Sequence, residues 1–122
     1  MNMQLLQDIV EREFPDIISS TVLGEVNELR IFLNDGSFMD VWLSLKLNGR
    51  YSYHWERRAL DNTVYRHDNA PHLKWQSVST FPKHYHDGSE GNVTASYISD
   101  DPEMAVREFL LFVRETVTLR NE

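Results

Sequence analysis

Three neighbouring segments of the sequence, residues 27–33, 37–46 and 50–58, alternate strongly between apolar and polar side chains. This period of two predicts β-strands with one face on a core and the other toward solvent. The strings LNDGS and LNGR separate the segments, and both carry the Asn/Asp–Gly chemistry of a hairpin turn. The sequence therefore predicts an antiparallel β-meander.

The length of each turn decides which residues share a face of this meander. A two-residue loop at Asp35-Gly36 would mix core and surface positions. A three-residue loop ending in a left-handed glycine at each turn instead pairs Ile31 with Met39 and Leu43 with Tyr53. The expected core face is then odd-numbered: Leu29, Ile31, Leu33, Met39, Val41, Leu43, Leu45, Tyr51, Tyr53 and Trp55.

Amphipathic helices are expected near both ends of the sequence. Residues 2–14 have apolar side chains at helical spacing, and Pro15 ends the pattern. Residues Asp100 to Glu103 predict a helix start, with an acidic cap, Pro102 in the first turn, and Glu103 placed for a capping box if Asp100 is the cap. The two helices can cover the odd-numbered face, which leaves the even-numbered face or a sheet end open.

The remaining elements complete an α+β pattern. Residues 17–23 predict a short edge strand, residues 63–67 a further strand, and residues 73–79 and 92–99 two weakly alternating strands. We expect a single domain over residues 1–122, built as an antiparallel β-meander sheet flanked by N-terminal and C-terminal amphipathic helices.

The charge of the chain is unevenly distributed. The net charge is −7, yet residues 50–86 contain six Lys or Arg, only three Asp or Glu, and all five histidines. A basic, histidine-rich middle is compatible with an anionic ligand such as RNA, whereas the acidic remainder argues against broad non-specific nucleic-acid binding. The absence of cysteine fits a cytoplasmic protein, and no apolar run predicts a membrane span.

His84 and His86 stand one residue apart in TFPKHYHDGSEG. In an extended segment both rings point to one side, close enough to share a metal or a phosphate, with His72, His67 or Asp68 as a third partner. The alternative is a pair of exposed histidines beside a turn. Because two histidines alone are a weak metal signal, we expect a site without metal or cofactor.

The segment YRHDNAPH brings Arg66, Asp68 and His72 close together in the sequence. Phosphodiester cleavage needs one group to take a proton, one to donate a proton and one to stabilise charge, and these residue types can do so. The alternative is a strand end at which Arg66 pairs with Asp68 and Asn69 caps a turn.

Residues 51–58 interleave aromatic and basic side chains, a pattern that can stack bases and bind phosphate. In the expected register the aromatic rings belong to the core, so only the basic groups remain for an anion. Arg57, Arg58 and Lys83 are the expected nucleic-acid or anion contacts. No glycine-rich phosphate loop, Gly-x-Ser-x-Gly elbow or His-Glu-x-x-His motif is present, which argues against P-loop and serine hydrolases.

Over most of its length the chain resembles the TumE-type family, small proteins described as toxins of bacterial and archaeal toxin–antitoxin pairs. The resemblance is carried by LNDGSFMDV, by YRHDNAPH and by FPKHYH, in this order. It implies a toxin of a type II pair, a helix-turn-helix antitoxin as partner, and an attack on RNA or translation. It also favours a shared site of Arg66, Asp68, His72, His84 and His86, without assigning their roles.

Two functions are therefore carried forward. The first is a small, metal-independent endoribonuclease in which His84 and His86 move protons, with help from His72, while Arg66 holds the phosphate and Asp68 orients a histidine. The alternative is a non-catalytic binding or regulatory protein. A homodimer through the even-numbered face, anchored by Trp42, is a further possibility for its assembly.

Overall fold

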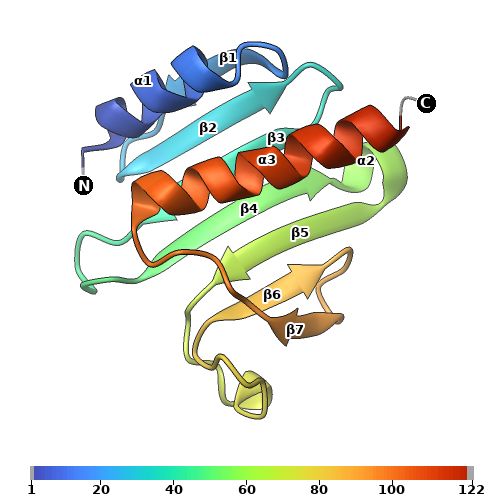
Figure 1. Ribbon diagram of the computed structural model, residues 1–122. Helices are drawn as coiled ribbons and strands as arrows, with labels where there is room; N and C mark the ends of the chain where they lie inside the picture. Colours follow the sequence, from blue (N-terminus) through green and yellow to red (C-terminus); the bar gives the residue numbers. More distant parts are fainter. Residues whose placement is uncertain (1, 121–122) are drawn as a thin grey trace.

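A computed structural model describes residues 2–120 and contains one antiparallel sheet whose strands follow the order β1 to β7 (Figure 1). Each strand pairs with the next along the chain, so the α+β meander predicted from the sequence is confirmed. The strands are β1 (Ile18–Leu23), β2 (Glu28–Leu33), β3 (Phe38–Leu43), β4 (Tyr51–Arg57), β5 (Thr63–Asp68), β6 (His84–Asp87) and β7 (Val93–Ala95).

Two long helices lie on the same face of the sheet, α1 (Met3–Glu13) and α3 (Pro102–Arg120) (Figure 1). The side chain of Asn2 caps α1 by accepting a hydrogen bond from the backbone N–H of Gln4. Because α3 begins at Pro102, Asp101 rather than the predicted Asp100 precedes its first residue. Two short helical turns complete the chain, α2 (Arg58–Asp61) and the 3-10 turn η1 (Leu73–Trp75).

The first hairpin has the predicted register. Ile31 lies opposite Met39, the backbone N–H of Leu33 donates to the carbonyl of Ser37, and Gly36 takes a φ of 93°. The left-handed conformation of this glycine closes the expected three-residue loop.

In the second hairpin the register differs from the predicted one by two residues, and the loop is correspondingly longer. Leu43 pairs with Tyr51 instead of Tyr53, and Leu45 is 74% exposed in the loop instead of buried. The hydroxyl of Ser44 accepts the backbone N–H groups of Lys46 and Leu47, so the chain turns before residue 45 can join the strand. A shift of two residues preserves the faces, and the rest of the odd-numbered core is confirmed.

The predicted strand at residues 73–79 is wrong, and the one at 92–99 shrinks to β7. Residues 73–75 form η1, and backbone hydrogen bonds from Val78 to Trp75 and from Phe81 to Val78 continue as turns. A long irregular connection therefore joins β5 to β6 and lies at the lower end of the sheet in Figure 1.

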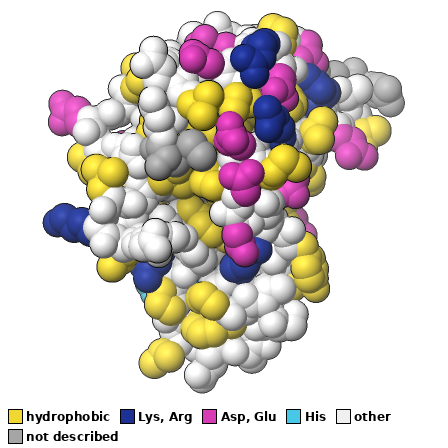
Figure 2. Space-filling view, turned by 60° about the vertical axis from the view of Figure 1, so that its left-hand side comes forward, with side chains coloured by type: hydrophobic (Ala, Val, Ile, Leu, Met, Phe, Trp, Pro, Cys, Tyr) yellow, Lys and Arg dark blue, Asp and Glu magenta, His cyan; other side chains and the backbone are white. Residues whose placement is uncertain are grey.

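Charged side chains also join α3 to the end of α1 and to the turn that follows it. Arg107 of α3 binds Glu13 at the end of α1, and Arg114 binds Asp16 just beyond it. Figure 2 shows acidic and basic side chains side by side on one face of the molecule. No helix within residues 2–120 is long and apolar enough to cross a membrane.

Arg57, the last residue of β4, joins the β4–β5 turn to the β2–β3 turn. Its guanidinium is buried, donates to the carboxylates of Asp35 and Asp61, and lies 4.9 Å from the ring of Trp55. The indole N–H of Trp55 donates to Ser37 Oγ at 2.9 Å in the same region. Loss of Arg57 would leave a carboxylate without its partner at the edge of the core.

We therefore expect Arg57→Ala to lower the free energy of unfolding by about 3 kcal/mol, the lower end for breaking a buried ion pair, because both carboxylates keep some exposure. Urea denaturation followed by tryptophan fluorescence measures this change. The neighbouring Arg58→Ala is the matched control, since Arg58 is exposed and its pair with Glu56 lies at the surface. Equal losses in both variants would contradict the structural role of Arg57.

Candidate functional site

Strand register brings the predicted site residues together on one face of the sheet. His54 of β4 lies opposite Arg66 of β5, and Arg66 lies opposite His86 of β6. In the next row Asp68 of β5 pairs with His84 of β6. Directly paired residues project to the same side of a sheet, and this side is opposite to the one that carries the core and the helices. The even-numbered face left open by the helices therefore holds the site.

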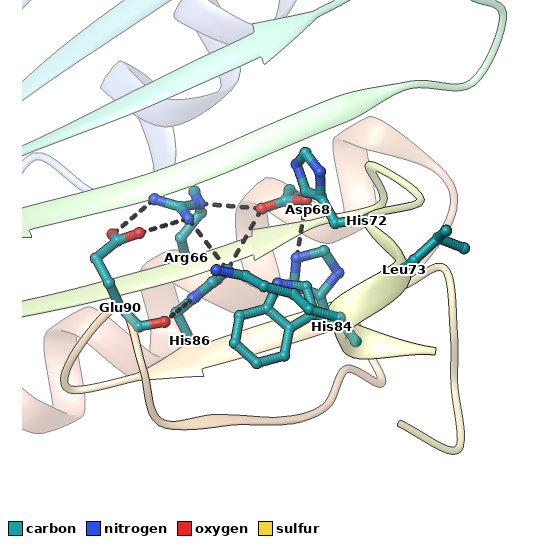
Figure 3. Close-up of a pocket in the computed structure, with 9 residues that line it drawn as sticks. Arg66, Asp68, His72, Leu73, His84, His86 and Glu90 are labelled. Atoms are coloured by element: carbon teal, nitrogen blue, oxygen red, sulfur yellow. Dashed lines mark hydrogen bonds and ion pairs between the residues drawn. The ribbon is translucent and has the colours of Figure 1, made fainter. Parts of the chain in front are cut away.

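The irregular connection between β5 and β6 builds a wall beside these rows. The ring of Trp75 lies 6.2 Å from that of His84 and 5.9 Å from that of His86. Together they enclose a pocket of about 560 Å³, a size typical of small-molecule sites (Figure 3). The pocket is lined by Arg66, Asp68, His72, Leu73, Lys74, Trp75, His84, His86 and Glu90.

Arg66 connects the charged groups of the pocket. Two guanidinium nitrogens donate to the carboxylate of Glu90, both at 2.8 Å, while Nε donates to Asp68 Oδ2 at 3.0 Å. Nη2 also donates to His86 Nε2 at 3.1 Å. The hydrogen bonds from Arg66 lower the pKa of Glu90, so this carboxylate is ionised at neutral pH. The guanidinium charge is thus shared between two carboxylates.

His84 and His86 are buried at the floor of the pocket, with exposures of 0% and 3%. The alternative of exposed histidines beside a turn is therefore wrong. Nδ1 of His84 lies 2.9 Å from the carbonyl of Pro82, and Nδ1 of His86 lies 2.8 Å from that of Glu90. A carbonyl can only accept, so each Nδ1 carries the hydrogen and each Nε2 faces the pocket. Burial, and then the charge of Arg66, lower the pKa of His86.

Asp68 lies between the two imidazoles. Its Oδ1 accepts the backbone N–H of Ala70 at 3.0 Å and lies 3.1 Å from His84 Nε2. Its Oδ2 lies 3.7 Å from His86 Nε2. The contact with His84 has the distance of an ion pair but not the geometry of a hydrogen bond, and His84 Nε2 is a buried nitrogen without a hydrogen-bond partner among the described residues. Figure 3 shows these groups pointing toward one another.

A comparison with protein families shows which family the chain belongs to. The family described as Toxin TumE matches residues 4–117, nearly the whole chain. The chain belongs to the TumE toxin family. Neither the curated proteins nor the solved structures yielded a match.

Membership of the TumE family confirms the resemblance seen in the sequence and makes the chain a member of a toxin family, which implies an antitoxin as the kind of partner. The family description names no substrate, so the chemistry of the pocket has to be argued from its residues.

All five residues expected to form the site of this TumE-family chain line one pocket. Arg66, Asp68, His84 and His86 form its floor, while His72 stands exposed at its rim. The register explains the convergence, because β5 and β6 run side by side even though a long connection separates them in sequence.

The three expected anion contacts lie elsewhere, and each has an acidic partner. Arg57 is the buried link described above, and Arg58 forms an ion pair with Glu56. Lys83 donates to the carbonyl of Ile98 and lies 3.1 Å from Asp100. None of the three lines the pocket, and their expected role as nucleic-acid or anion contacts stays a prediction.

His67, one of the candidate third partners, lies on the opposite face of the sheet. Its ring stacks on Tyr85 at 4.2 Å and meets the edge of Phe109 from α3, and its Nδ1 is 2.8 Å from Ser96 Oγ. Burial lowers its pKa to about 4, so the ring stays neutral at physiological pH. His67 packs on the helix side of the sheet, and Asp68 is the partner that meets both site histidines.

Sequence reasoning missed the residues that the β5–β6 and β6–β7 connections contribute. Trp75 and Lys74 fell in the segment wrongly assigned to a strand, and Glu90 sits in the polar loop after β6. Because loop residues carry no periodicity, the sequence offered no signal for Glu90. Trp75 was detectable only as an aromatic residue next to YRHDNAPH.

The hydrogen bonds from Nδ1 to backbone carbonyls predict the tautomer of His84 and of His86. In the metal-free protein, long-range ¹H–¹⁵N correlation spectra should show His84 and His86 with hydrogen on Nδ1 and a lone pair on Nε2. The exposed His72, which has no fixed partner in the described structure, serves as the internal reference with averaged signals. A hydrogen found on Nε2 with none on Nδ1 would show that the rings are turned the other way.

Proposed function

We propose that this TumE-family toxin acts on RNA as a small endoribonuclease and that the pocket of Arg66, Asp68, His84 and His86 is its active site. One observation carries the proposal: two buried imidazoles and one carboxylate converge at the floor of a pocket whose wall includes the partly exposed Trp75 and the exposed Lys74. The pocket is the place where proton-accepting groups and a space for a ligand coincide.

The rim supplies what a single-stranded nucleic acid requires. Trp75 is partly exposed, and the ammonium of Lys74 lies 4.7 Å from its ring. An aromatic face can stack a base, and a neighbouring cation can meet a phosphate. Lys74 has no acidic partner in the described structure, in contrast to Arg57, Arg58 and Arg66. A flipped or unpaired nucleotide would thus stack on Trp75 at the pocket, with its phosphate near Lys74.

The remaining charge pattern supports a restricted substrate over general RNA binding. Inside the pocket two carboxylates, Asp68 and Glu90, balance the two cations Arg66 and Lys74. A chain with a net charge of −7 gains little from counterion release. We therefore infer an RNA presented in a particular structure or complex, not any exposed strand.

We also propose that the antitoxin is the helix-turn-helix protein implied by the resemblance and that the two proteins form a type II pair. Co-expression with the protein encoded by the neighbouring reading frame tests this pairing, and restored growth together with co-purification supports it. An RNA antitoxin, or no neutralisation by that protein, would contradict it.

Induction of the chain in a bacterial host should arrest growth, and His86→Ala should abolish the arrest. Purified protein should cleave RNA, with the rate reduced by about 100-fold or more in His86→Ala because a group at the reacting phosphodiester is lost. Circular dichroism checks that the variant folds.

Trp75→Ala leaves the floor in place and should weaken RNA binding by about 1–3 kcal/mol, the contribution of one stacked base.

Arg107→Ala is the matched control, since it removes a cation from the opposite side of the sheet. It should retain both growth arrest and cleavage. Growth arrest without RNA cleavage, still dependent on His86, would instead favour the alternative of a binding protein that acts through a partner. Arrest that persists in a folded variant lacking both His84 and His86 would remove the pocket from the mechanism.

A further inference from the structure

We propose that Asp68, His84 and His86 bind one divalent transition-metal ion at the floor of the pocket. A carboxylate oxygen and two imidazole Nε2 atoms lie within 4.8 Å of one another. This departs from the metal-free site expected from the sequence, where two histidines one residue apart were only a weak signal. The third group, Asp68, comes from the neighbouring strand and is brought in by register.

The distances between the three groups suit a shared ion. Zinc–nitrogen bonds of roughly 2.0–2.1 Å in a tetrahedral site place neighbouring ligand atoms about 3.3 Å apart. Asp68 Oδ1 and His84 Nε2 are 3.1 Å apart, and Asp68 Oδ2 and His86 Nε2 are 3.7 Å apart. A rotation of the carboxylate adjusts its oxygens to both Nε2 atoms, and small rotations of the imidazoles would draw the three groups, which lie within 4.8 Å of one another, onto one ion.

The buried Nε2 of His84 is the independent observation that points to a ligand. The side chain is fully buried, this nitrogen has no hydrogen-bond partner among the described residues, and it is aimed at Asp68. An unpaired polar atom in such a place costs on the order of 1–3 kcal/mol. A cation between His84 and Asp68 would satisfy the nitrogen lone pair and the carboxylate together.

The outer partners of the two imidazoles match those of metal-binding histidines. Each Nδ1 donates to a backbone carbonyl, of Pro82 for His84 and of Glu90 for His86. A hydrogen bond at one ring nitrogen fixes the tautomer and orientation that present the other nitrogen to a metal. Both rings are therefore already turned for coordination through Nε2.

Arg66 is the group that competes with the ion. Its Nη2 donates to His86 Nε2, and its Nε donates to Asp68 Oδ2. Arg66 also donates to Glu90 through Nη1 and through the same Nη2, and these two bonds would hold the guanidinium at Glu90 if the ion displaced Nη2 from His86. Glu90 would then act as the counterion that lets Arg66 remain beside a bound cation.

The ligand types select the class of metal. Two imidazoles with one carboxylate favour Zn²⁺, Co²⁺ or similar transition metals, whereas Mg²⁺ and Ca²⁺ prefer oxygen ligands. Three protein ligands leave at least one coordination position facing the pocket, as in catalytic metal sites. The ion would also give a net positive charge to a pocket whose own charges balance, and this link to RNA rests on the proposed function.

Binding is tested with the full chain, purified without metal. Calorimetric titration with Zn²⁺ should give one site per chain, at least 100-fold tighter than with Mg²⁺. His84→Gln and Asp68→Asn should each weaken Zn²⁺ binding by about 100-fold or more, since loss of even an outer partner costs 10–100-fold. His54→Gln and His72→Gln are the matched controls, because they remove an imidazole beside the floor and at the rim.

A measurement on the unaltered protein covers the case in which a buried variant fails to fold. Zn²⁺ should shift the Nε2 signals of His84 and His86 and leave those of His54, His67 and His72 in place. Bound Co²⁺ should add visible absorption that Zn²⁺ displaces. No binding, unshifted His84 and His86 signals, or weakening in His72→Gln alone would overturn the proposal.

The role in RNA cleavage is tested separately. If Zn²⁺ binds at His84 and His86 but no RNA is cleaved, the metal site stands and the proposed function fails. If the verified metal-free protein cleaves RNA in EDTA at an undiminished rate, the ion has no part in cleavage, and the histidines act by proton transfer as the sequence suggested.

Discussion

The register between β5 and β6 is the constraint on which the site depends. A slip of β6 by one residue would turn His84 and His86 to the helix side of the sheet and bring Tyr85 out. The native register is held from both sides, because His67 packs against Phe109 and Tyr85 against Phe112 of α3 while the charged groups face outward. The core therefore positions the site, although no core residue touches the pocket.

This arrangement buries charged and polar side chains on the open face of the sheet, which is unfavourable unless they are paired. Arg66, Asp68 and the two histidines are largely removed from water, and charges in such places are favourable only when paired. Most of their polar atoms have partners, including two backbone carbonyls and one backbone N–H. His84 Nε2 does not. This one inward-facing nitrogen is the observation on which the proposed metal site rests, because a buried polar atom without a partner calls for an explanation.

The parts of the fold that could be predicted are those with a strong period. The alternation of β2 to β4 and the stripes of α1 and α3 each reflect one buried face, and the sequence carries that signal directly. The predicted register of the second hairpin was wrong by two residues, because the hydroxyl of Ser44 binds the backbone of Lys46 and Leu47 and the chain turns early. The wall of the pocket was wrongly predicted as a strand, because turns such as those after Leu73 have no regular spacing of apolar residues. The site was predictable in its members, since they cluster in two short motifs, but not in its partners Glu90 and Trp75.

The charge of the middle segment shows why composition alone overstates an anion site. Residues 50–86 are basic in the sequence, yet the fold pairs Arg57, Arg58, Arg66 and Lys83 with acids drawn from inside and outside that window. What remains facing the pocket is nearly neutral. A polyanion would meet no broad positive surface there, so under the proposed function its recognition would come from stacking on Trp75, from the ammonium of Lys74, unpaired among the described residues, and from an ion at the floor. The proposal therefore depends on the charge at the pocket floor and not on the net charge of the chain.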